Sequence, residues 1–317
     1  NIHWIYRVEF STDIFNDNFL KFKAKKVIET KEASKLKTVS IKKSVVIVGM
    51  GPAGIFCALS LALSGINCTI IERGKSVENR VRDVERFFKV MVMDNESNFH
   101  FGVCGSGTFS DGKLTARTKH PFYSFLIKEL IEAGAPDEIA YLAKPHIGTD
   151  RLRKVVINLR KKLQSYGANI LFEERFEKLI CDKDKVCGVI TNKREIKTDY
   201  VVLAMGYSAR DTLISLIENG LFVESKGFAM GYRLELPQKQ IDIAMYGREI
   251  KDVPPAEFFH TKHFPNKGFS VFTFCMCPGG TVLPASSNSG ELVLNGMSNY
   301  KRNGRFCNAA IVVSHNP

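Results

Sequence analysis

The sequence lacks the cysteine spacing of metal sites and of small disulfide-bonded domains. Its eight cysteines include no Cys-x-x-Cys pair, and no paired Cys/His spacing suggests zinc. Several of them stand inside apolar runs, where cysteine behaves as a small hydrophobic residue. We therefore predict a reduced, cytoplasmic chain without a metal site.

A membrane span is missing too. Residues 45–71 carry hardly a charge and would be long enough to cross a bilayer. Turn residues interrupt this stretch, however, and they are Gly49, Gly51, Pro52, Gly54 and Gly65. The first residues show no basic region followed by an apolar core, so no signal peptide is predicted. The chain also begins without Met, which suggests a fragment or a processed chain.

The positive charge lacks the pattern of a nucleic-acid surface. The net charge is +12, but much of it comes from scattered lysines, and no tight arginine cluster is interleaved with aromatic residues. We therefore expect an unidentified small molecule, rather than nucleic acid or a membrane, as the partner. The hydrophobic content of 44% and charged content of 25% are ordinary for a globular chain.

The pattern of apolar residues predicts an α/β protein with three parts. Residues 1–43 form a small basic segment, with an alternating pattern at 3–10 that predicts a strand. Residues 44–212 alternate strands with helices, which predicts a parallel α/β nucleotide-binding domain. The glycine motif described below makes this a discontinuous Rossmann-like FAD/NAD(P)-binding domain. Residues 213–317 begin a mixed, strand-rich substrate domain that is incomplete. Strands are expected at 45–48, 69–72, 169–172, 176–181, 186–191 and 200–204, and helices at 53–63, 76–91, 123–133 and 150–166.

Three of these expectations concern local structure. Ser76 should cap the second helix, and Thr149 or Asp150 should cap the fourth. The glycine-rich stretch 101–113 should be irregular.

The most informative motif is Val-Val-Ile-Val-Gly-Met-Gly-Pro-Ala-Gly at 45–54. It follows a predicted strand, opens a predicted helix, and is followed about 20 residues later by an acid, Glu72. Gly49 permits the tight turn, Gly51 lets the backbone approach a pyrophosphate, and Gly54 lets the helix pack on the sheet. Glu72 would accept hydrogen bonds from ribose hydroxyls.

Two further features favour FAD over NAD. Pro52-Ala53 in the glycine motif and Glu72-Arg73-Gly74 after the second strand are typical of flavoproteins. Residues 198–206 end in Ala204-Met205-Gly206, similar to the strand and small-residue turn that contact the dinucleotide in such proteins. Met205 replaces the usual Thr, so only a backbone role is expected there.

The chain resembles a largely uncharacterised FAD-dependent (NAD(FAD)-utilising) dehydrogenase family of bacteria and archaea. The strings that carry the resemblance are residues 94–98, 101–114, 143–150, 206–211, 275–280 and 295–298. The resemblance implies that 101–114 contacts the flavin diphosphate and ring edge, and that Phe176 holds adenine through its backbone. In the first of these segments the implied contacts are Gly105, Ser106, Gly107, Thr108, Ser110 and Lys113. A surface loop whose glycines only make turns is the alternative.

No catalytic group stands out. Cys275 and Cys277 are candidates for a redox pair, although with one residue between them an internal disulfide would be strained. His146 is a candidate proton donor, but a histidine that follows proline in a loop is more often structural. Arg233 is a candidate for binding an anionic substrate, with a surface ion pair as the alternative.

The sequence as a whole predicts an FAD-dependent oxidoreductase of unknown substrate. No second strand–glycine motif–helix unit is present, so NAD(P)H as a transient donor would reach the flavin from the substrate side. The late Gly-Asp segment of FAD domains is also absent, which suggests C-terminal truncation. The alternative is a non-catalytic FAD-binding or RNA-associated flavoprotein.

Overall fold

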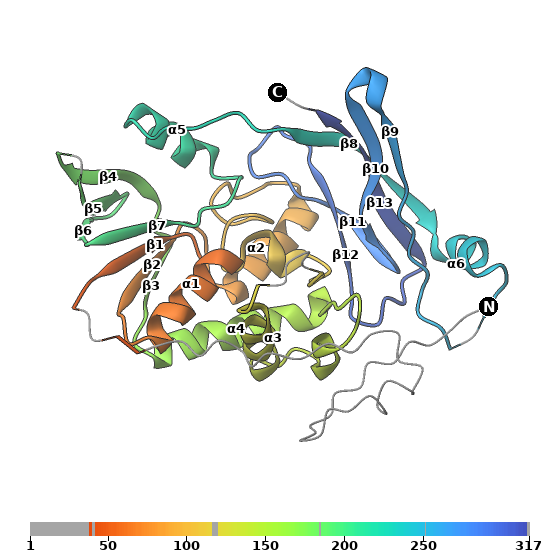
Figure 1. The fold of residues 1–317 in the computed structure, drawn as a ribbon, viewed down its shortest axis with the longest axis horizontal. Coiled ribbons are helices and arrows are strands. Elements are labelled where there is room, and N and C mark those ends of the chain that lie inside the picture. Colours follow the sequence, from red (N-terminus) through yellow and green to blue (C-terminus); the bar gives the residue numbers. More distant parts are fainter. Residues whose placement is uncertain (1–37, 40–41, 116–119, 184, 251, 316–317) are drawn as a thin grey trace, which may run out of the picture.

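The computed structural model describes residues 38–39, 42–115, 120–183, 185–250 and 252–315. Most of the basic segment 1–43, including the strand predicted at 3–10, lies outside these residues. The first part of the fold is a parallel sheet with strand order β3-β2-β1-β7 (Figure 1). Its strands are β1 (Val45–Val48), β2 (Cys68–Glu72), β3 (Asn169–Phe172) and β7 (Tyr200–Leu203).

Both faces of the parallel sheet are covered, which explains why β1 is apolar at every position. On one face Ile47 packs with helices α1 (Pro52–Leu63), α3 (Tyr123–Glu132) and α4 (Thr149–Ser165). On the other face Val46 and Val48 pack against an antiparallel sheet and helix α5 (Arg210–Glu218). That small sheet has the order β4 (Phe176–Asp182), β5 (Lys185–Thr191), β6 (Glu195–Lys197).

The second part of the structure is rich in antiparallel strands, as predicted. Its main sheet has the order β8-β13-β10-β9, and a separate hairpin pairs β11 with β12. The strands are β8 (Phe228–Pro237), β9 (Thr261–Phe264), β10 (Phe269–Cys277), β11 (Gly280–Pro284), β12 (Leu294–Ser298) and β13 (Phe306–His315). Helix α6 (Gln238–Tyr246) in this part was not predicted from the sequence, although Pro237 precedes it and Gly247 ends it in a left-handed conformation.

The structure differs from the sequence-based expectations in four local details. Ser76 occupies the N-cap position of helix α2 (Val77–Val90), but its side chain makes no capping hydrogen bond. Gly148 stands at the N-cap of α4, while the Asp150 carboxylate accepts a hydrogen bond from the Tyr300 N–H at 2.8 Å. Within the stretch expected to be irregular, residues Gly105–Phe109 form a short 3-10 helix, η2. Helix α5 was not predicted, and Leu216 buries it against the sheet.

The two parts pack against each other through a small apolar cluster. Val84 of α2 with Phe99 and Phe109 contacts Leu283 of β11 and Ala285. Two buried hydrogen bonds cross the same junction, from the Asn98 side-chain amide to the Ser287 carbonyl and between His100 and the Ala285 carbonyl. In Figure 1 the hairpin β11–β12 accordingly lies between the helices of the first part and the main antiparallel sheet.

Candidate functional site

A tight turn at the end of β1 requires two of the motif's glycines. Gly49 has φ +99°, and a Cβ there would lie 2.5 Å from the Ala204 carbonyl oxygen of the neighbouring β7 turn. A Cβ on Gly54 would lie 2.0 Å from the Gly49 carbonyl oxygen. Both glycines therefore let backbone segments pack closely, and neither can carry a side chain without a shift of the backbone.

Gly51 is different because its missing side chain leaves open space. A Cβ there would meet only the Ala204 carbonyl oxygen, at 3.9 Å. The first helical hydrogen bond of α1 runs from the Ile55 N–H to the Gly51 carbonyl, so the preceding amides of Ala53 and Gly54 have no partner within the helix. Such a helix N-terminus with free amides suits a phosphate group.

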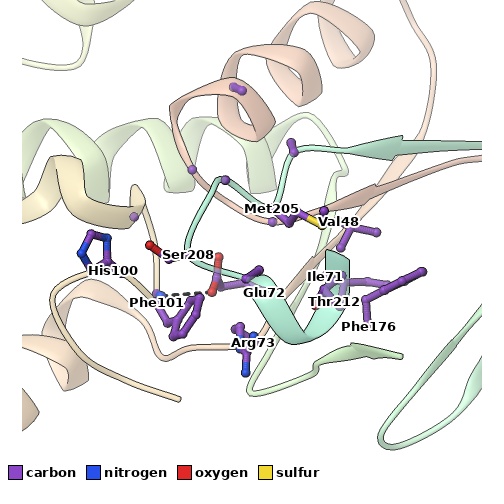
Figure 2. A pocket seen from close by; sticks show the side chains of 18 of the residues that line it. Val48, Ile71, Glu72, Arg73, His100, Phe101, Phe176, Met205, Ser208 and Thr212 are labelled. Carbon is purple, nitrogen blue, oxygen red and sulfur yellow. Dashed lines mark hydrogen bonds between the residues drawn. The ribbon is translucent and has the colours of Figure 1, made fainter. Parts of the chain in front are cut away.

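This turn opens into a pocket of about 410 Å³, within the size range of small-molecule sites. Figure 2 shows the side chains that line this pocket, and in that view Glu72 and Phe101 lie close to each other. Twelve of the residues predicted to bind the cofactor line it: Gly49, Gly51, Pro52, Ala53, Glu72, Arg73, Gly105, Ser106, Phe176, Ala204, Met205 and Gly206. The structure therefore brings the β1 turn, the end of β2, η2 and the turn after β7 to one cavity.

Glu72 is buried at the wall of the pocket and accepts three backbone hydrogen bonds. One oxygen, Oε2, accepts from the Met50 N–H at 2.9 Å, and Oε1 accepts from the N–H groups of Gly74 at 2.8 Å and Gly102 at 3.0 Å. A carboxylate can accept about four hydrogen bonds. Glu72 thus has acceptor capacity left for a ligand hydroxyl, and it also ties the three segments around the pocket together.

Arg73 lines the pocket with its guanidinium already engaged. It forms ion pairs with Glu96 at 2.7 Å and Asp211 at 2.8 Å, and its guanidinium lies 4.1 Å from the centre of the Phe101 ring. Burial alone would lower the pKa of Arg73, but the hydrogen bonds that it donates to both carboxylates raise it above its usual value. The guanidinium therefore fixes the wall of the pocket, joining β2 to α5.

Five of the predicted residues do not line this pocket: Gly54, Gly107, Thr108, Ser110 and Lys113. The Thr108 hydroxyl donates to the Val103 carbonyl at 2.6 Å, and that of Ser110 donates to the Gly107 carbonyl at 2.9 Å. Lys113 Nζ lies 2.8 Å from Asp111 Oδ2 instead of beside the pocket. These side chains stabilise the loop or serve another cluster, described below.

Arg80 organises the loop that forms one side of the pocket, a role that was not predicted from the sequence. Its side chain is fully buried, and it donates to four carbonyl oxygens at 2.6–2.9 Å and to the Thr108 hydroxyl at 3.2 Å. Those carbonyls belong to residues 98, 99, 103 and 105. Burial lowers the pKa of Arg80 to about 10. Its position in a charged, amphipathic helix makes it look like a surface residue.

Besides Phe101 of the predicted segment 101–114, the pocket includes residues that sequence reasoning missed, notably His100 and Tyr207. The rings of His100 and Tyr207 meet edge to face with 5.5 Å between centroids. Burial lowers the pKa of His100, so the neutral imidazole is favoured at neutral pH. His100 directly precedes the predicted segment, which is the one signal that could have found it.

The candidate catalytic residues lie together but outside this pocket's lining. Cys277 Sγ is 3.5 Å from both Lys113 Nζ and Arg233 Nη2, and Cys275 is half-buried nearby. His146 stacks on Tyr300 and hydrogen-bonds the Tyr300 carbonyl at 3.0 Å, while its backbone pairs with Lys113. Burial lowers the pKa of His146. The Arg233 guanidinium is not in a surface ion pair, because it binds Asn308 and the Cys275 carbonyl.

Comparison with known proteins adds two family matches. Residues 42–84 match the family described as "FAD binding domain", and residues 227–317 match "FAD-dependent protein, C-terminal domain-like". These two stretches are therefore similar to parts of FAD-dependent proteins. An uncharacterised protein of Clostridium beijerinckii is 39% identical over 324 residues, covering 98% of this chain. The chain spans 60% of the length of that relative.

Three solved structures match this one at low TM-scores. FqzB matches with a TM-score of 0.41 and 13% identity, over 90% of this chain and 56% of its own. CtdE, solved in complex with FAD, matches with a TM-score of 0.37 and 14% identity, over 87% and 60%. L-amino acid deaminase from Proteus vulgaris matches with a TM-score of 0.32 and 16% identity, over 66% and 56%.

The described residues contain neither a helix suited to cross a membrane nor a group of side chains suited to bind a metal. None of their helices combines the length and the apolar character needed to cross a membrane. In the same residues no three His, Cys, Asp or Glu side chains gather as a metal-binding group.

Proposed function

We propose that the pocket binds FAD and that the chain is part of an FAD-dependent oxidoreductase, of the dehydrogenase family that its sequence resembles. The observation that carries the proposal is the open space at Gly51, where the first turn of helix α1, with the Ala53 amide, borders the cavity beside the Glu72 carboxylate. A diphosphate needs the open space and the free amide of the helix N-terminus, and an adenosine ribose needs the carboxylate.

Each end of the pocket has a distinct role in this proposal. The amides of the β1 turn hold the diphosphate, and the unused acceptor of Glu72 holds a ribose hydroxyl. Phe176, which is buried and borders the pocket from β4, supports adenine with its backbone (Figure 2). Residues 105 and 106 border the opposite, flavin-facing side. When bound, the flavin supplies hydride or electron transfer, and the protein supplies position and electrostatics.

The identity of the cofactor tests the first half of the proposal. The purified protein should be yellow, and denaturation should release FAD, identified by chromatography against FMN and NAD standards. Glu72 has a ribose to bind only if the adenosine half is present, so we expect FAD. Recovery of FMN alone, or of NAD without flavin, would contradict the assignment.

Reduction of the bound flavin tests the second half. We propose NAD(P)H as a transient donor, and mixing it with the flavin-loaded protein under anaerobic conditions should bleach the flavin absorbance band. Turnover with an added electron acceptor would establish an oxidoreductase. A protein that holds FAD but turns over with no donor would instead be a non-catalytic flavoprotein.

A further inference from the structure

A second cluster of reactive side chains gathers where the 111–113 loop meets the antiparallel sheet. At the end of β10, the pairing with β13 shifts by one residue between Phe274 and Cys277, which places Cys275 in a bulge with φ +48°. The bulge takes the two cysteines out of the regular alternation that the sequence suggested. Bulges often re-aim a side chain beside a functional site.

Two cations lie beside this pair, in contact with the Cys277 sulfur and the Cys275 carbonyl. Cys277 is fully buried, and its Sγ lies 3.5 Å from Lys113 Nζ and 3.5 Å from Arg233 Nη2. The Arg233 guanidinium also donates to the Cys275 carbonyl at 2.8 Å. Gly296 makes room for this arrangement, because a Cβ there would lie 2.0 Å from Arg233 Nη2.

The ion pairs behind the cysteines leave the cluster positive. Lys113 and Arg302 both pair with Asp111, and Arg302 and Lys144 both pair with Glu257. Together with Arg233, four cations face two carboxylates. A thiolate balances one of the two excess positive charges, and a bound anion can balance the other.

Unpartnered polar atoms concentrate in the same place. Five buried side-chain nitrogen or oxygen atoms in the described residues lack a hydrogen-bond partner, and four of them belong here. They are Asp111 Oδ1, Ser298 Oγ, Arg302 Nε and Asn308 Nδ2. All four residues are nine-tenths buried or nearly so. Asn308 is joined to the cysteines through Arg233, to which it is bonded at 2.7 Å. Buried polar groups are normally satisfied, so this concentration points to a ligand with polar groups of its own.

The cations Lys113 and Arg233 favour one thiolate in the cysteine pair. A hydrogen bond from Cys277, with Lys113 and Arg233, lowers the pKa of Cys275 to about 5 against the opposing effect of burial. The hydrogen bond with Cys275, and burial, raise the pKa of Cys277. The two sulfurs therefore share one proton at neutral pH. The negative charge of Asp111 disfavours a thiolate. Arg302, Glu257 and His146 form a further group of titratable side chains next to Asp111 and Lys113.

We propose that Cys275 is a nucleophilic thiolate that exchanges with a small disulfide bearing carboxylate groups. The Cys275 sulfur forms a bond to one sulfur of the disulfide, the original S–S bond breaks, and its electron pair leaves on the other sulfur as a thiolate. Cys275 is thereby oxidised to a mixed disulfide and half of the reagent is reduced. The surplus cations bind the carboxylates, and Cys275 is the sulfur that solvent reaches because Cys277 is fully buried.

The test uses 5,5′-dithiobis(2-nitrobenzoate), an anionic disulfide whose released thiolate is coloured, and the neutral 2,2′-dithiodipyridine as a comparison. The starting protein is the Cys181→Ser/Cys187→Ser variant, which removes the two exposed thiols of the described residues. At about pH 6, one thiol should react at least about ten-fold faster than free cysteine, because a low thiol pKa maintains the thiolate there. Peptide mass spectrometry should place the label on Cys275.

Two variants separate the thiolate site from an accessible but ordinary cysteine. Cys275→Ser should abolish the fast phase, and Lys113→Gln should move the midpoint of the rate–pH profile upward and reduce the preference for the anionic reagent. Labelling of Cys277 or Cys57 instead, no labelling, or a rate that rises only above about pH 8, near the usual thiol pKa, would overturn the proposal. FAD is not needed for any of these measurements, so their failure is distinct from failure of the proposed cofactor site.

Discussion

At the scale of single residues, three glycines in one turn have different physical tasks. A side chain on Gly49 or Gly54 would collide with backbone at 2.5 or 2.0 Å, so these two positions determine whether the turn can form. A side chain on Gly51 would enter the pocket without touching backbone closely. The structure therefore separates a stability role from a binding role within six residues.

We expect Gly51→Val to abolish FAD binding while leaving the fold intact. The branched side chain occupies the space that the diphosphate needs, and circular dichroism should stay near that of the wild type. Flavin stoichiometry after purification is the measurement. Lys161→Val, which introduces the same side chain at an exposed position of α4, should bind normally. Full stoichiometry in Gly51→Val would place the diphosphate elsewhere.

Asp111→Asn should lower the free energy of unfolding by about 3 kcal/mol at neutral pH, because it leaves the cations of Lys113 and Arg302 without their carboxylate. Burial alone would raise the pKa of Asp111, but Lys113 and Arg302 lower it. The ionised carboxylate therefore stabilises the fold above its ordinary pKa of about 4, and this contribution is lost as the pH falls through the lower folded-state value. Urea unfolding at several pH values should show the two proteins converging in acid; a difference independent of pH would contradict this.

At the scale of elements, the loop from His100 to Phe109 is shaped by one buried side chain of α2. Arg80 donates hydrogen bonds to carbonyls at four positions of the chain between 98 and 105. The loop in turn contributes His100, Phe101, Gly105 and Ser106 to the pocket. One interior arginine therefore links the packing of α2 to the shape of the proposed flavin side.

Replacing this arginine should affect both stability and cofactor binding. Arg80→Met leaves several buried carbonyls without a donor, at a cost of about 3 kcal/mol or more. Hydrogen exchange should accelerate over residues 98–110, and FAD affinity should fall. Arg80→Lys should not rescue either property, because an ammonium group cannot reach all five acceptors. Arg82→Met, exposed on the same helix, is the control, and equal behaviour of the two methionine variants would refute the role.

At the scale of the whole molecule, the parallel and antiparallel parts share a buried junction. Leu283 and Ala285 pack on Phe99 and Phe109, and the ion pair between Arg302 and Asp111 spans the same two parts. The predicted boundary near residue 213 therefore lies between two parts that have buried clusters of their own and share a further one at their junction. The three-part domain division itself stays a prediction.

We expect thermal unfolding in a single cooperative transition that this junction controls. Leu283→Ala removes a side chain that is only 3% exposed, so it should cost about 2–5 kcal/mol and lower the Tm measured by both near- and far-UV circular dichroism. Leu292→Ala, at a position 81% exposed, should leave the Tm nearly unchanged. Two separate transitions, with only one shifted by Leu283→Ala, would show that the parts unfold independently.

The sequence by itself determined the local part of this protein. Strand β1, the glycine turn, helix α1 and the acid at the end of β2 are encoded within about thirty residues, and the periodicity of apolar residues gives their order. The sequence also indicated the turn after β7 as a partner of the glycine turn, because parallel strands end at the same edge of a sheet.

Only the tertiary structure decided which distant groups meet. Arg80 looks like a surface cation in the sequence, yet it is buried among carbonyls. Lys113 is expected to contact the flavin, yet it lies beside Cys277. The caps of α2 and α4 and the bulge at Cys275 likewise depend on contacts with segments far along the chain. Hydrophobic periodicity reports which face of an element is buried, whereas the partner of a polar group is determined by long-range packing, which leaves no periodic trace in the sequence.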